Sequence, residues 1–115
     1  YHVEVGELMT AELLALGLLD SADLQNQTEK TPAYKKYFMH GTSHHLGLDT
    51  HDYGLIDQPI NANMVFTVEP GIYVPQEGFG IRLEDDVVVQ QTGEPLNLMK
   101  NIPIEAEEIE ALMNP

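Results

Sequence analysis

The feature that most constrains the fold is a series of short apolar runs in the second half of the chain, separated by glycine, proline and acidic residues. The runs have the length of β-strands, and the last is rich in β-branched residues. In order they are Met64 to Val68, Ile72 to Val74 and Ile81 to Gln90, with Glu69-Pro70-Gly71, Gly78 and Gly80 between them. Strands joined by such short interruptions predict a largely antiparallel sheet.

Helical patterns lie on both sides of these runs. Apolar residues recur at helical spacing over residues 2–16, and Gly17 suits the left-handed position that follows a helix. Residues 20–30 are polar and predict a loop. After Pro103, apolar residues indicate a short final helix. A helix, then mostly antiparallel strands, then a final short helix predicts an α+β fold.

Length and composition limit the class of protein. The 115 residues correspond to one domain or part of one, and a hydrophobic content of 43% can form a core. The chain opens on Tyr1 and runs straight into helix-like sequence, so we expect a piece of a longer protein. The absence of cysteine excludes disulfides and thiolate sites, and it is consistent with a cytoplasmic origin. A net charge of −14 would repel nucleic acid, and no apolar run approaches the length of a membrane span.

Four of the five histidines lie within twelve residues, in the segment His40-Gly-Thr-Ser-His44-His45-Leu-Gly-Leu-Asp-Thr-His51. Each imidazole could bind a metal or carry a proton near neutral pH. His40 and His44 have the spacing of a helical zinc motif, but Gly41 stands where that motif needs glutamate. A lone histidine is more often a surface residue, so the segment by itself leaves a functional and a structural role open.

Two glutamates interrupt the apolar runs. Glu69 follows five mainly apolar residues and precedes a turn, and a carboxylate buried there would have to be paired, protonated or bound to a cation. Glu84 lies in the last run, where alternation puts it on one face with Arg82 and puts Asp85 on the apolar face. A bulge or a hydrogen-bonding role would resolve the conflict at Asp85. The simpler alternatives are a solvated glutamate at a sheet edge for Glu69 and a surface ion pair for Glu84.

Together these residues form a recognisable ligand set. One imidazole and two carboxylates, with further histidines nearby, suit manganese, cobalt, iron or zinc. Hydrolysis by paired metal ions needs bridging carboxylates and an activated water. Three protein ligands are too few for two ions. The residues alone therefore predict part of a hydrolytic metal site.

Three blocks of the sequence resemble Xaa-Pro aminopeptidase (aminopeptidase P) in order and spacing. The blocks are His40-Gly-Thr-Ser-His44 through Leu46-Gly-Leu-Asp49-Thr-His51-Asp52, Thr67-Val-Glu69-Pro-Gly-Ile-Tyr73, and Gly80-Ile-Arg82-Leu-Glu84-Asp-Asp86. That family belongs with prolidase, creatinase and methionine aminopeptidase to the pita-bread group. The resemblance covers essentially the whole chain and implies the carboxyl-terminal half of a pita-bread fold.

The resemblance also implies a cofactor and its ligands. His44 and Glu69 would bind one metal ion, and Glu84 would bridge two ions. The family's metals are two divalent ions, usually manganese, with cobalt or zinc as alternatives. The implied reaction removes an N-terminal residue that precedes proline, so the implied partners are peptides with proline at the second position, and neither nucleic acid nor membrane.

Catalytic roles follow from the same resemblance. Glu69 would handle the proton near the bridging water. His40 and His51 match outer histidines that contact substrate or stabilise the intermediate, and Arg82 matches an arginine that braces the site. His45 stands where several relatives carry a bulkier apolar or aromatic residue, which we expect to tune the pocket without removing the chemistry.

The chain departs from the family pattern in what it lacks. Two further aspartate ligands of the family come from an upstream strand, and no matching motif precedes His40. Residues 1–115 would then be the carboxyl-terminal part of the catalytic domain, without its upstream half and without the N-terminal domain. We expect this piece to be inactive alone, and to self-associate or to pair with the missing half.

Two alternatives use the same blocks. Prolidase also handles proline, and what separates dipeptide from longer substrates lies largely outside this chain. A non-enzymatic binding module of the pita-bread fold would usually have replaced the ligands, whereas His44, Glu69 and Glu84 are all present.

Overall fold

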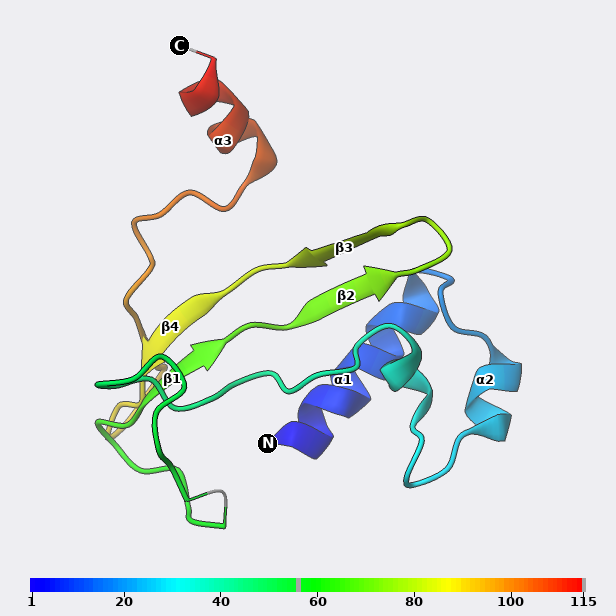
Figure 1. Ribbon diagram of the computed structural model, residues 1–115, viewed down its shortest axis with the longest axis horizontal. Coiled ribbons are helices and arrows are strands. Elements are labelled where there is room, and N and C mark those ends of the chain that lie inside the picture. The colour runs from blue at the N-terminus through cyan, green and yellow to red at the C-terminus, as the bar shows by residue number, and fades with distance from the viewer. Residues whose placement is uncertain (56, 115) are drawn as a thin grey trace. The chain divides into compact units, whose positions relative to one another are not determined.

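The computed structural model describes residues 1–55 and 57–114 (Figure 1). They form two compact units, each assembled from two stretches of chain: Tyr1–Thr42 with Pro70–Arg82, and Ser43–Glu69 with Leu83–Pro115. Helices and antiparallel strands occur together, which confirms the predicted α+β class. The elements are α1 (His2–Ala15), α2 (Ser21–Asn26), the 3-10 helix η1 (Ala33–Lys36), β1 (Val65–Val68), β2 (Gly71–Val74), β3 (Phe79–Arg82), β4 (Asp85–Val88), β5 (Leu96–Asn97) and α3 (Ala106–Met113).

α1 agrees with the helix predicted over residues 2–16. Leu16 is its C-cap, and Gly17 follows with a φ of 71°, a left-handed conformation that glycine adopts without strain. Leu13 is buried at 1% exposure, whereas Leu8 and Leu16 are 60% and 69% exposed. The apolar stripe of α1 is therefore only partly covered by the described part of the chain.

The core of the first unit joins α1 to the segment after η1 and to a hairpin. The clustered buried side chains are Leu13, Leu19, Tyr37 and Val74. β2 and β3 pair as an antiparallel hairpin, and Gly78 in its turn has a φ of 71°. The backbone N–H of Tyr73 donates to the carbonyl of Tyr37 at 2.9 Å. This bond ties β2 to the segment that leads into the histidine-rich part of the sequence.

α2 corrects the prediction of a loop over residues 20–30. The Asp20 carboxylate accepts from the N–H of Asp23 at 2.9 Å, and the Asp23 carboxylate accepts from the N–H of Asp20 at 3.1 Å. This capping box satisfies amide donors that a helix start leaves unpaired. The Asp20 amide and then the Lys36 ammonium lower the pKa of Asp23, and the Asp23 carboxylate in turn raises the pKa of Lys36. The polar composition hid a helix because its capping residues are themselves polar.

The second unit contains an antiparallel sheet in the order β1-β4-β5. β1 pairs with β4 from Val65 opposite Val88 to Val68 opposite Asp85. Upstream, His45 forms an isolated antiparallel bridge with Phe66 of β1. The sheet therefore carries part of the histidine-rich segment along one of its strands.

The single strand predicted over Ile81 to Gln90 is wrong. The chain leaves β3 at Arg82 and enters β4 at Asp85, so Arg82 and Glu84 do not share a strand. Asp85 becomes the first residue of β4, which removes the conflict of an acid on an apolar mid-strand face. The cause is Pro70, which follows the end of β1. Proline has no N–H to donate to a neighbouring strand, so the ladder between β1 and β4 stops at the pair Val68–Asp85.

α3 confirms the predicted final short helix, and none of its described side chains is buried. Across residues 1–55 and 57–114, no helix combines the length and the apolar character needed to cross a membrane.

Gly6 allows the ring of Tyr34 to pack on α1. A Cβ at this position would lie 2.5 Å from Cε1 and 2.7 Å from Cζ of that ring. We expect Gly6→Ala to lower the free energy of unfolding by about 1 kcal/mol. Overpacking costs about 1–3 kcal/mol, which exceeds the roughly 1 kcal/mol that alanine gains over glycine in a helix. Urea unfolding measures the difference.

The Tyr34→Ala background provides the control for this substitution. Without the ring, Gly6→Ala should become stabilising, because only the helix propensity remains. A Gly6→Ala protein as stable as the wild type, or the same effect in both backgrounds, would contradict the close packing of Tyr34 on α1.

Candidate metal centre

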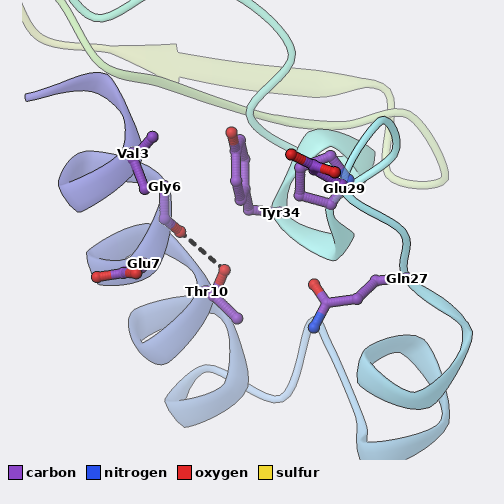
Figure 2. Close-up of a pocket in the computed structure, with 8 residues that line it drawn as sticks. Val3, Gly6, Glu7, Thr10, Gln27, Glu29 and Tyr34 are labelled. Carbon is purple, nitrogen blue, oxygen red and sulfur yellow. Dashed lines mark hydrogen bonds between the residues drawn. The ribbon is translucent and has the colours of Figure 1, made fainter.

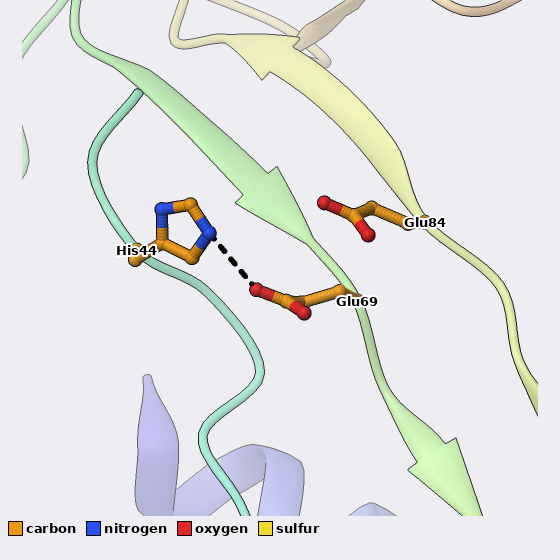
Figure 3. A group of neighbouring side chains, drawn as sticks. All are labelled: His44, Glu69 and Glu84. Carbon is orange, nitrogen blue, oxygen red and sulfur yellow. Dashed lines mark ion pairs between the residues drawn. The ribbon is translucent and has the colours of Figure 1, made fainter. Parts of the chain in front are cut away.

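Three of the predicted site residues converge in the second unit: His44, Glu69 and Glu84 (Figure 3). Each offers one ligand atom, and these atoms all lie within 4.8 Å of one another. Ligands on opposite sides of one ion, each about 2.1 Å from it, would be about 4.2 Å apart. A small decrease in the distances between the three ligand atoms would therefore allow all of them to bind a single cation.

The pairing of β1 with β4 positions the two glutamates. Val68 stands opposite Asp85 at the end of the ladder, Glu69 follows Val68, and Glu84 precedes Asp85. Both glutamates therefore lie one residue beyond the same end of the paired strands. Two carboxylates this close disfavour each other's charge, and a bound cation would offset that repulsion.

Hydrogen bonds of the His44 backbone, together with the β-bridge of the next residue, hold His44 against β1. The N–H of Thr67 donates to the carbonyl of His44 at 3.0 Å, and the N–H of His44 donates to the hydroxyl of Thr67 at 3.0 Å. The next residue, His45, forms the bridge to Phe66 and stacks on its ring, with 4.4 Å between the ring centroids. The His44 imidazole projects from this loop toward the glutamates (Figure 3).

Two contacts orient the His44 ring. Nδ1 lies 2.9 Å from the carbonyl oxygen of His45, which can only accept, so Nδ1 carries a proton. Nε2 lies 3.1 Å from Oε1 of Glu69, whose side chain is only 13% exposed. With Nδ1 protonated, a neutral ring presents a lone pair at Nε2, and a lone pair facing a carboxylate calls for a further proton or a cation.

This donor set fits a divalent ion. A metal-binding histidine commonly donates its other N–H to a backbone carbonyl, as His44 does, which fixes the ligating nitrogen and the ring plane. A nitrogen with carboxylate oxygens suits manganese, cobalt, iron or zinc. Glu84 is exposed, so its side of the cluster is open.

His51 joins the cluster from the same loop. Its ring lies 4.1 Å from that of His44 between centroids, with an interplanar angle of 31°. Asp52 closes the loop, because its carboxylate accepts from the backbone N–H groups of Leu48 and Tyr53 at 2.9 and 2.8 Å. His51 is exposed, so its imidazole can reach a molecule bound beside His44.

The remaining predicted catalytic residues belong to the first unit. Nδ1 of His40 lies 2.7 Å from the carbonyl oxygen of Gly41 and therefore donates, which leaves Nε2 to accept from the Tyr73 hydroxyl at 2.9 Å. Arg82 is exposed at the end of β3, opposite Gly71. The predicted roles of His40 and Arg82 beside the glutamates stay predictions, as does the expected influence of His45 on the pocket.

The sequence reasoning missed the supporting residues Thr67, Asp52 and Tyr73. Thr67 could have been found, since residues two apart on a strand share a face and Thr67 stands two positions before Glu69. Asp52 directly follows His51, and an aspartate in a glycine-containing loop often binds backbone amides. Tyr73 had no local pattern, because it lies 33 residues from its partner His40.

A cavity of about 440 Å³ lies in the first unit between α1 and the segment around η1 (Figure 2). Its lining residues are Val3, Gly6, Glu7, Thr10, Gln27, Glu29, Pro32 and Tyr34. The Thr10 hydroxyl is engaged within α1, where it donates to the carbonyl of Gly6 at 2.8 Å. No predicted site residue lines this cavity, so the candidate chemistry rests with the histidine and the glutamates.

Comparisons with known proteins give these residues a context. Residues 4–91 match the family model described as Metallopeptidase family M24. The chain is 43% identical over 122 residues to the Xaa-Pro aminopeptidase of Escherichia coli (strain K12), covering 96% of this chain and 27% of that protein.

Solved structures agree with this match. Pseudomonas aeruginosa aminopeptidase PepP superposes with a TM-score of 0.80 at 38% identity, over 97% of this chain and 28% of that one. Aminopeptidase P from Escherichia coli with the inhibitor Pro-Leu gives 0.76 at 42% identity, over 96% and 27%. The chain thus spans about a quarter of the length of the relatives it matches.

The contact with the His45 carbonyl makes a prediction about His44. We expect its proton on Nδ1 whenever the ring of the folded protein is neutral, because a carbonyl oxygen cannot donate. Long-range proton–nitrogen correlation spectra report the protonated nitrogen, and His2, exposed in α1, is the reference. A neutral His44 with its proton on Nε2 would contradict the described geometry.

Proposed function

The chain belongs to metallopeptidase family M24, and from this we propose that it is the carboxyl-terminal part of the catalytic domain of an Xaa-Pro aminopeptidase. That enzyme would release an N-terminal residue that precedes proline. The proposal is carried by the convergence of His44, Glu69 and Glu84 in a chain 43% identical to such an aminopeptidase. Since the chain spans about a quarter of these relatives, the activity is proposed for the longer protein to which it would belong.

We assign the converging residues as metal ligands. His44 and Glu69 would bind one divalent ion, and Glu84 would bridge this ion and a second. Manganese is the proposed metal, ahead of cobalt and zinc, because the resemblance to Xaa-Pro aminopeptidases implies it, and imidazole with carboxylate is compatible with all three. Bound ions of this kind supply a Lewis acid that lowers the pKa of water toward neutrality. Three protein ligands are too few for two ions, so further aspartates would come from the upstream half of the domain.

The other site residues would act around the scissile carbonyl. Glu69, held 3.1 Å from His44, would accept the proton of the attacking water and pass it to the proline nitrogen. His51, exposed beside His44, would stabilise the negative charge that develops on the carbonyl oxygen. His40 would contact the substrate, and Arg82 would brace the site.

Peptides with proline at the second position would be the substrates. The Pro-Leu inhibitor in the Escherichia coli structure supports a site that accepts proline. A net charge of −14 opposes binding to nucleic acid, so that class of partner is disfavoured. The cysteine-free sequence is consistent with a cytoplasmic enzyme.

In the complete protein, Glu69→Gln should lower kcat/KM for an Xaa-Pro-Xaa tripeptide by about 10²–10⁴-fold, which is the usual contribution of a proton-transferring residue. Release of the N-terminal amino acid measures the rate after manganese is restored to chelator-treated protein. Glu77→Gln is the control, since Glu77 is exposed in the turn between β2 and β3 and should leave the rate unchanged. Full activity of the Glu69→Gln protein would remove Glu69 from the proposed site.

The same assay separates the alternative functions. A protein that cleaves only the Xaa-Pro dipeptide would be a prolidase. A protein that binds manganese and cleaves neither the dipeptide nor the tripeptide would be a binding module. An Xaa-Ala tripeptide cleaved as fast as its proline counterpart would contradict the proposed specificity.

The chain alone should bind manganese more weakly than the complete protein and should hydrolyse none of these peptides, because part of the ligand set would be missing. Large apolar side chains such as Leu16 and Leu48 are 69% and 103% exposed, and they would favour association. Light scattering should detect oligomers, or a complex with the upstream half when both are present. A monodisperse monomer at high concentration, or cleavage at the rate of the complete protein, would contradict this expectation.

A further inference from the structure

Thr67 is the most deeply buried residue beside the cluster. It occupies β1, pairs with Asp86 of β4, and is 2% exposed. A polar side chain buried to this degree must find hydrogen-bond partners. Both partners of the Thr67 hydroxyl belong to the candidate centre: the backbone of His44 and the carboxylate of Glu69.

The direction of these hydrogen bonds is fixed by chemistry. The backbone N–H of His44 can only donate, so the hydroxyl accepts from it at 3.0 Å. The single hydroxyl proton is then directed to Oε1 of Glu69 at 3.2 Å. The N–H of Thr67 donates to the carbonyl of His44 at 3.0 Å, which fixes the loop to β1 a second time. A side chain without a hydroxyl could not connect both partners.

This connection acts on the atoms that face each other in the cluster. Oε1 of Glu69, which accepts from Thr67, is also the atom 3.1 Å from Nε2 of His44. Without the hydroxyl, Oε1 of Glu69 would lose a hydrogen-bond donor that comes from the paired strand. With it, the separation of the two donor atoms is set by a buried residue of a β-strand, a rigid element.

We propose that Thr67 is a positioning residue of the metal centre, whose hydroxyl joins the His44 backbone N–H to the Glu69 carboxylate and so keeps the two ligand side chains at the spacing that one divalent cation requires. The inference rests on the proposed function, because it takes these two residues as ligands. It assigns Thr67 no contact with substrate or metal. Its effect passes through Glu69 and the His44 backbone, in the manner of outer partners that orient metal ligands.

The test is a calorimetric titration of the metal-free complete protein with Mn²⁺. Thr67→Val keeps the shape and removes the hydroxyl, and it should weaken Mn²⁺ binding by about 10–100-fold, as loss of an outer partner does. Thr67→Ser restores the hydroxyl and should restore the affinity. Thr10→Val is the matched control, because it removes a hydroxyl that donates only within α1, and its affinity should equal that of the wild type.

A purely structural role predicts a different pattern. Thr67→Val would then lower the urea midpoint without changing the Mn²⁺ affinity of the folded protein, and this result would overturn the inference. Should Thr67→Val not fold, Thr67→Cys replaces it, since a thiol is a weaker donor and acceptor. Equal Mn²⁺ affinities of the Cys and Ser variants would likewise overturn it.

Failure of the proposed function would look different again. Wild-type protein that binds no Mn²⁺ would remove the metal site itself, whatever the variants do. Wild-type binding with an undiminished Thr67→Val affinity would leave the site in place and remove only the positioning role of Thr67.

Discussion

The antiparallel pairing of β1 with β4 is the interaction on which the candidate centre depends. The ladder ends where Val68 stands opposite Asp85, and the next residue on each stretch is a glutamate. In an antiparallel pair, the end of one strand always lies beside the start of the other. Pro70 then prevents β1 from continuing, so Glu69 lies just past the end of the ladder, beside the stretch that carries Glu84.

The same pairing concentrates electron-rich atoms in one place. Nε2 of His44 lies 3.1 Å from Oε1 of Glu69, and the ligand atoms of His44, Glu69 and Glu84 all lie within 4.8 Å of one another. Like charges at such short range disfavour each other, and a bound cation would offset this repulsion. When its ring is neutral, His44 adds a nitrogen lone pair to the two carboxylates. A divalent ion is therefore a suitable ligand for this group of side chains.

The sequence predicted those parts of the molecule whose causes are local. α1 and the strands around Glu69 follow from periodicity and from Gly17, and the α+β class follows from their order. α2 was missed because its capping aspartates resemble loop residues, and the break before Asp85 was missed because its cause, Pro70, lies on the partner stretch. The three proposed ligands were named from short motifs, yet neither their convergence nor the Tyr73 contact of His40 could be derived, since both depend on pairing across the chain.

The division into two units explains why a part of this site can be organised by itself. His44, Glu69, Glu84 and His51 all belong to one unit and are positioned by one sheet, one bridge and one closed loop. If the remaining ligands come from an upstream half, as proposed, a cation would be bound by groups from both parts of the domain. Metal binding and assembly of the domain would then be linked, since an ion that binds only the assembled state stabilises that state. The same ion would take part in the reaction and hold the two halves of the domain together. Thr67 would fix the positions of His44 and Glu69 in this part of the domain before the ion binds.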